Sequence, residues 1–128
     1  MAKIVAFVDD SKAILASVDF AVADLVKGGD IEFITFINPE ELLTKAKTGE
    51  LVYDMLFTDI NMPQMNGFEL SEQLKAIPAL KQKPIIALTT ENSADMKQKG
   101  KSIGIAGWIT KPFNETKVIG AIKKVLAI

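Results

Sequence analysis

The stretch Lys3–Asp10 reads KIVAFVDD, a short apolar run that ends in two adjacent acids. Three later runs also end in a reactive side chain: Tyr53–Asp59 (YDMLFTD), Pro84–Thr89 (PIIALT) and Ala106–Lys111 (AGWITK). Runs of this length and composition are typical of strands that are buried on both faces of a parallel sheet. Because open α/β sheets bind ligands at the carboxyl ends of their strands, we expect the four reactive ends to meet in one crevice.

Segments with helical spacing of apolar residues separate these runs, so strand and helix alternate five times. The expected strands cover residues 3–8, 31–37, 53–58, 85–88 and 106–110, and the expected helices cover residues 14–26, 39–48, 68–77, 93–102 and 115–126. This alternation predicts an α/β doubly wound (βα)5 domain of the flavodoxin-like type with a five-stranded parallel sheet. The second strand is followed only by Asn38-Pro39, which favours an edge position and the strand order 2-1-3-4-5.

Length and composition limit the possible classes of protein. The 128 residues, of which 48% are hydrophobic, predict a single domain over residues 1–128 with a substantial core. The apolar runs are too short to span a bilayer, and a strand at residue 3 leaves no room for a signal peptide. The absence of cysteine fits a reducing cytoplasm, where we expect a monomer. Without histidine or cysteine, Ser-His-Asp and Cys-His catalysis and the usual zinc ligands are excluded.

The net charge of -1 is distributed unevenly along the chain. Residues 1–90 carry eight lysines against thirteen acids, whereas residues 91–128 carry seven lysines against three acids. A basic face could attract nucleic acid, but the chain has no arginine. We therefore expect an acidic protein partner and no nucleic acid, with a solvated helix face as the alternative.

Asp9, Asp10 and Asp59 are the candidate metal ligands. Adjacent acids usually mark a surface turn, but these three follow two buried strands, which favours a shared site. Three crowded carboxylates repel one another, so we expect at least one raised pKa in the absence of a cation. Mg²⁺ prefers oxygen ligands and keeps several waters, which leaves room for a phosphate oxygen.

Asp59 lies in the most specific stretch of the chain, DINMPQMNG over residues 59–67. A carboxylate beside a metal ion can attack phosphorus and form an acyl phosphate, while the metal and Lys111 neutralise the transferring group. Thr89 alone would be an ordinary strand-end residue, but together with Lys111 it is interpreted as a hydroxyl that follows the phosphoryl group. Trp108 alone would be a core residue, but it neighbours the weakest predicted helix, where its ring could change rotamer.

This combination resembles the receiver domain of two-component response regulators over essentially the whole chain. The resemblance rests on Asp9-Asp10, on Asp59 within Asp-Ile-Asn-Met-Pro, on Thr89 and on Lys111-Pro112-Phe113. The stretches LTTE (residues 88–91) and GWITKPF (residues 107–113) are similar to single-domain chemotaxis regulators of the CheY type.

The resemblance implies a role for each residue of the predicted site. Asp59 would be the phosphoacceptor, and magnesium would be held by Asp10, Asp59 and the backbone carbonyl of Asn61, with Asp9 acting through water. Thr89 and Lys111 would grip the phosphoryl oxygens.

Two further pairs of positions follow from the resemblance. Thr89 and Trp108 would form the switch, and Asn61 and Glu91 would tune dephosphorylation.

The sequence departs from the family pattern at three positions. Trp108 stands where Tyr or Phe is more common, so we expect it to signal by burial and shape rather than by a phenolic hydrogen bond. Leu15 replaces an arginine that many chemotaxis members carry. Gly100 is expected to interrupt the helix over residues 93–102 and to reduce the rigidity of the output surface.

The predicted function is therefore that of a stand-alone receiver rather than an enzyme acting on a separate substrate. A sensor histidine kinase would phosphorylate Asp59, a phosphatase could assist dephosphorylation, and the domain would catalyse only its own phosphorylation and dephosphorylation. A target protein, with a flagellar motor switch as one candidate, would bind the face formed by residues 93–126.

Two other functions compete with this interpretation. A small magnesium-dependent aspartyl-phosphate hydrolase would need a substrate-binding cap and a second acid two residues after Asp59, where Asn61 stands. A receiver-shaped adaptor would bind its partners without phosphorylation, and its Asp59→Asn variant would retain full signalling.

Overall fold

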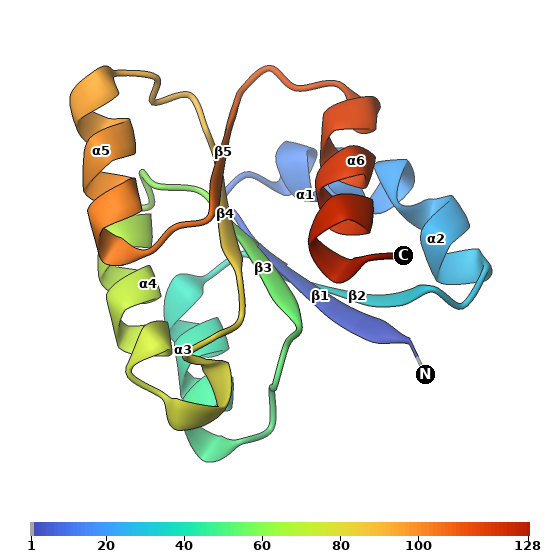
Figure 1. Cartoon of the computed structure of the whole chain (residues 1–128), viewed down its shortest axis with the longest axis horizontal. Helices are drawn as coiled ribbons and strands as arrows, with labels where there is room; N and C mark the ends of the chain where they lie inside the picture. Colours follow the sequence, from blue (N-terminus) through green and yellow to red (C-terminus); the bar gives the residue numbers. More distant parts are fainter. Residues whose placement is uncertain (1) are drawn as a thin grey trace.

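A computed structural model describes residues 2–128 and shows a five-stranded parallel sheet with helices on both faces (Figure 1). The elements are β1 Lys3–Val8, α1 Lys12–Ala21, α2 Ala23–Lys27, β2 Ile31–Phe36, α3 Pro39–Thr48, β3 Met55–Thr58, α4 Gly67–Lys75, a 3₁₀ turn Pro78–Leu80, β4 Ile85–Thr89, α5 Ala94–Ile103, β5 Gly107–Thr110 and α6 Glu115–Leu126. The strand order β2-β1-β3-β4-β5 confirms the predicted doubly wound fold. Within the described residues, we find no helix with the length and apolar character needed to cross a membrane.

The sheet separates two apolar clusters, one on each face. Successive residues of β1 alternate between them: Val5 and Phe7 pack with α1 and α6, whereas Ala6 and Val8 pack with α3 and α4. In Figure 1, α1, α2 and α6 lie on one side of the sheet and α3, α4 and α5 lie on the other. Because both faces are covered, the central strands are apolar at nearly every position, which explains the continuous runs in the sequence.

Side-chain caps fix where the helices begin. The Asn38 side chain accepts a hydrogen bond from the Glu40 N–H at 2.8 Å, Pro39 occupies the first turn of α3, and Gly49 ends the helix with φ 83°. Asn-Pro is a common start of a helix and glycine is a common end, so these three features are the ones that the sequence favours. Residues of the same chemical kind cap the other long helices by accepting a backbone N–H, namely Ser11, Asn66, Ser93 and Asn114.

The expected single helix over residues 14–26 is wrong. The structure has two helices, α1 and α2, separated at Val22, whose φ of -96° and ψ of 2° leave the helical region. A β-branched residue loses rotamer freedom in a helix, and the apolar spacing continues across the break, so periodicity alone cannot locate it.

Strand boundaries differ from the expectation by one or two residues. β3 begins at Met55 rather than at Tyr53, because the Asp54 carboxylate turns back to accept the Ile4 N–H at 2.7 Å. β2 ends at Phe36, one residue before the predicted end.

The expected interruption of the helix at Gly100 is also wrong. α5 runs without a break from Ala94 to Ile103, and Gly100 is buried in it. One glycine costs a helix about 1 kcal/mol, which neighbouring contacts can offset. The missing side chain here makes room for the ring of Trp108.

Tyr53 generates a prediction about stability. Its side chain is fully buried, its hydroxyl has no hydrogen-bond partner among residues 2–128, and burial raises its pKa. We expect Tyr53→Phe to keep the free energy of unfolding or to raise it by about 1 kcal/mol, because the variant removes an unpaired buried polar group. Urea unfolding measures this change. As a control, Tyr53→Ala should lose about 3 kcal/mol or more through the cavity it leaves. A clear loss in Tyr53→Phe would show that the hydroxyl is hydrogen-bonded.

Candidate functional site

The carboxyl ends of four strands bring the predicted site residues to one edge of the sheet. Asp9 follows β1, Asp59 follows β3, Thr89 ends β4 and Lys111 follows β5. Hydrogen bonds continue the ladder past the strand ends, from the Asp59 N–H to the Val8 carbonyl at 3.1 Å and from the Lys111 N–H to the Thr89 carbonyl at 2.8 Å. The backbone register of the sheet therefore fixes the spacing of these side chains.

Asp9, Asp10 and Asp59 form a compact acidic group. One carboxylate oxygen from each lies within 4.8 Å of the others. Asp9 is completely buried and Asp59 is 7% exposed, whereas Asp10 is open to solvent. A set of carboxylate oxygens with one exposed side fits a divalent cation that keeps part of its water shell, and Mg²⁺ has this preference.

Lys111 lies between the two buried carboxylates. Its Nζ is 2.7 Å from Asp9 Oδ2 and 3.1 Å from Asp59 Oδ2. The other oxygen of each carboxylate accepts a backbone N–H, from Ser11 at 2.9 Å for Asp9 and from Ile60 at 2.7 Å for Asp59. Each buried carboxylate thus has both a charge partner and a backbone donor, which is the condition for burying charge at tolerable cost.

In both Asp9 and Lys111, burial and ion pairing shift the pKa in opposite directions, and the net result is a raised pKa for each. Burial raises the pKa of Asp9 above its ordinary value, although Lys111 and the Ser11 N–H oppose this shift. Repulsion from Asp59 is the smallest contribution, so a pKa does rise as predicted, but chiefly through desolvation. Burial would lower the pKa of Lys111, but hydrogen bonds and charge from Asp9 and Asp59 outweigh it and leave that pKa raised.

The loop between β4 and α5 is centred on Glu91, which contacts three of the predicted residues. Its N–H donates to Thr89 Oγ1 at 3.2 Å, and its carboxylate accepts from Asn61 Nδ2 at 2.7 Å. Its carbonyl accepts from Trp108 Nε1 at 2.8 Å. The two positions that the resemblance assigns to tuning, Asn61 and Glu91, are therefore in direct contact. The two positions that it assigns to the switch both bond to Glu91.

How Trp108 signals stays a prediction, but its indole N–H makes a hydrogen bond to the Glu91 carbonyl that the expectation of burial and shape did not include. The sequence contained the relevant signal, since indole is always a donor and seeks a partner when it is buried. A second hydrogen bond between β5 and this loop was not anticipated. The Thr110 hydroxyl donates to Asn92 Oδ1 at 3.1 Å.

Gly67 closes the loop that follows Asp59. Its N–H donates to the Ile60 carbonyl at 2.8 Å, and a Cβ at this position would collide with the Asp59 carbonyl oxygen. Only glycine allows the start of α4 to lie this close to the residue that carries the central carboxylate.

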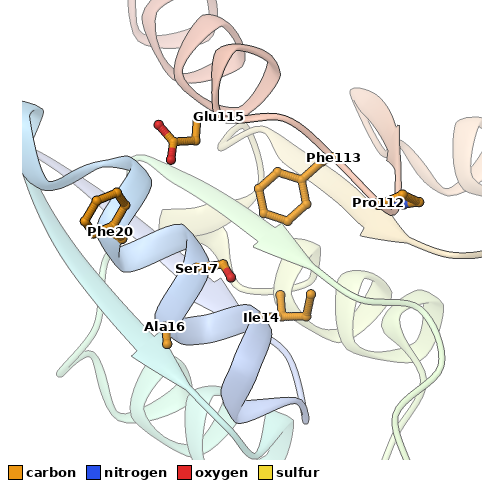
Figure 2. A pocket seen from close by; sticks show the side chains of 7 residues that line it. All are labelled: Ile14, Ala16, Ser17, Phe20, Pro112, Phe113 and Glu115. Carbon is orange, nitrogen blue, oxygen red and sulfur yellow. The ribbon is translucent and has the colours of Figure 1, made fainter.

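A groove of about 560 Å³ lies between α1 and the segment that leads into α6 (Figure 2). Its lining residues are Ile14, Ala16, Ser17, Phe20, Pro112, Phe113 and Glu115. Phe20 is 76% exposed there. None of the predicted site residues lines the groove, so it is separate from the acidic group, although Pro112 directly follows Lys111.

Comparison with known families matches residues 5–123 to the response regulator receiver domain. The chain belongs to this family. The receiver is 32% identical to protein PilG of Pseudomonas aeruginosa over 116 residues, which cover 91% of this chain and 82% of PilG.

Solved structures agree with this assignment. The chemotaxis protein CheY4 of Vibrio cholerae is 34% identical to the receiver with a TM-score of 0.87, covering 98% of this chain and 99% of CheY4. A BeF₃-activated receiver domain of DrrB from Thermotoga maritima is 25% identical with a TM-score of 0.82, and both chains are covered completely. The resemblance inferred from the sequence, to receivers and to single-domain chemotaxis regulators, is confirmed.

The raised pKa of Asp9 predicts a conflict between stability and metal binding. When the pKa of an acid is higher in the folded state than in the unfolded state, the free energy of unfolding of the protein falls as pH rises through the folded-state pKa. The charged form of Asp9 therefore opposes folding at neutral pH. We expect Asp9→Asn, measured by urea unfolding with EDTA at pH 7, to be more stable than the wild type. The difference should vanish below the unfolded pKa of about 3.9.

The same variant should bind Mg²⁺ about 10- to 100-fold more weakly, as measured by titration of tryptophan fluorescence. Asp19→Asn, which alters an exposed acid of α1, is the control and should change neither property. A less stable Asp9→Asn at neutral pH would contradict this account.

Proposed function

We propose that this receiver accepts a phosphoryl group on Asp59 from the phosphohistidine of a sensor histidine kinase. The observation that carries the proposal is the position of Lys111, whose ammonium lies within hydrogen-bond distance of both buried carboxylates at the sheet edge. A cation held in this place can neutralise the oxygens of a transferring phosphoryl group, which is the main catalytic requirement of the reaction.

The Asp59 carboxylate attacks phosphorus, the phosphorus–nitrogen bond of the donor breaks, and its electron pair remains on the departing imidazole. The Ile60 N–H holds Asp59 Oδ1, which orients the carboxylate for attack. Asp10, Asp59 and the Asn61 carbonyl are the proposed magnesium ligands, with Asp9 acting through water. Bound Mg²⁺ would supply charge neutralisation and alignment of the phosphoryl oxygens.

The output step begins at Thr89. Its buried hydroxyl, which now accepts the Glu91 N–H, turns to the phosphoryl oxygens and releases the loop. The loop then moves together with Trp108, whose indole N–H keeps its bond to the Glu91 carbonyl, and the change reaches α5, β5 and α6.

The proposed target face carries the lysines of the basic half of the chain. Hollows on either side of Trp108 are lined by apolar residues of β5 together with Lys97, Lys101 and Lys124. This pairing of apolar and cationic surface suits an acidic protein segment. A cytoplasmic target such as a flagellar motor switch remains the candidate, since a chemotaxis regulator is among the similar structures.

The phosphorylation step has a direct test. After mixing with acetyl phosphate and Mg²⁺, intact-mass measurement should show one acid-labile phosphoryl adduct, because Asp59 can take the group from a small donor. The adduct should be absent from Asp59→Asn and should not form in EDTA. A wild-type protein without an adduct, or an adduct that persists in Asp59→Asn, would refute the proposal. Steady turnover of unrelated phosphate esters would instead favour a hydrolase.

The switch step can be separated from phosphorylation with Thr89→Ala. We expect this variant to form the adduct and to lose the change in tryptophan fluorescence that the phosphodonor produces, because no hydroxyl remains to couple the loop to the phosphoryl group. Thr90→Ala, at the exposed neighbouring position, is the matched control and should keep the signal. An unaltered signal in Thr89→Ala would exclude this route.

A further inference from the structure

Gly100 is in unusually close contact with the switch aromatic. A Cβ built on Gly100 would lie 2.9 Å from Cζ3 of Trp108 and 3.4 Å from its Cε3. Real Cβ atoms do not approach another carbon this closely, so the indole occupies space that any other residue at position 100 would fill. Two departures from the family pattern lie on this face, tryptophan at position 108 and glycine at position 100. They form a steric pair, because the indole fits only where position 100 has no side chain.

A second aromatic ring, that of Phe68 in α4, packs beside the indole near Gly100. Phe68 lies 6.3 Å from Trp108 between ring centroids, and Lys99 Nζ lies 4.9 Å from the centre of the Phe68 ring. A Cβ at position 100 would also lie 3.5 Å from Phe68 Cε1. The indole is therefore held between α5 and α4.

The indole connects its contact with Gly100 to the loop between β4 and α5. Cζ3, which touches Gly100, and Nε1, which donates to the Glu91 carbonyl, lie at opposite ends of a rigid ring system. A push on Cζ3 must rotate or translate the whole ring, and rotation turns the indole N–H away from the Glu91 carbonyl, which weakens a hydrogen bond that depends on a near-linear angle. The position of Glu91 thus depends on the residue at position 100.

We propose that Gly100 is a positioning residue that seats Trp108 so that the indole N–H holds Glu91 against Asn61 at the rim of the acceptor site. This inference rests on the proposed phosphorylation of Asp59. With Glu91 held, the Asn61–Glu91 contact restricts the approach of water to the acyl phosphate. With Glu91 released, the rim opens and the phosphoryl group is hydrolysed faster.

The test uses Gly100→Ala with Gly120→Ala as the matched control, because Gly120 lies in a helix and a Cβ there would have no neighbour within 4 Å. Alanine favours a helix over glycine, so Gly120→Ala should raise the urea midpoint. Gly100→Ala should lower it and, in the folded protein, should shift tryptophan emission to longer wavelength. In a Trp108→Phe background both glycine substitutions should raise the midpoint, because the shorter ring leaves room for the methyl group.

The functional arm measures the half-life of the acid-labile adduct. Gly100→Ala and Trp108→Phe should both shorten it, by about fivefold if one net hydrogen bond is lost. Gly120→Ala should leave it unchanged. The inference is overturned if Gly100→Ala raises the midpoint as Gly120→Ala does, or if Trp108→Phe keeps the wild-type half-life. Absence of any adduct in the wild type would instead refute the phosphorylation proposal, and the steric pairing would still be decided by the midpoints.

Discussion

The contact of the Lys111 ammonium with Asp9 and Asp59 is the interaction on which the site depends. It joins the ends of β1, β3 and β5, and it lets two carboxylates lie at a sheet edge where one is completely buried and the other nearly so. A buried ion pair of this kind contributes little net stability, because desolvation offsets the attraction. The contact instead maintains an arrangement in which an acidic group and an ammonium are already assembled where a divalent ion and a phosphoryl group would bind.

The site stores unfavourable energy that the rest of the fold must offset. Desolvation of Asp9 opposes folding at neutral pH, while the apolar clusters on both faces of the sheet supply the stabilisation that tolerates it. This unfavourable desolvation is thus concentrated at one edge, as is common at functional sites where burial and neighbouring charges perturb pKa values.

A chain of short contacts leads from the carboxyl edge of the sheet to the surface. Thr89, Glu91 and Trp108 are joined by backbone and side-chain hydrogen bonds, and the indole then rests on Gly100 of α5. α5 buries little of its own surface, so its position depends on these contacts more than on an apolar stripe. A displacement at Thr89 therefore has a physical route to the face that carries the lysines.

The sequence alone determined the alternation of strand and helix, the strand order and the set of residues at the sheet edge. It could do so because buried parallel strands are continuous apolar runs, and because their carboxyl ends must share one edge. The tertiary structure alone decided the break at Val22, the bond from Trp108 to Glu91 and the fit of Gly100 against the indole. These features depend on which side chains meet across different elements at distances of a few ångströms, and neither periodicity nor spacing along the chain carries that information.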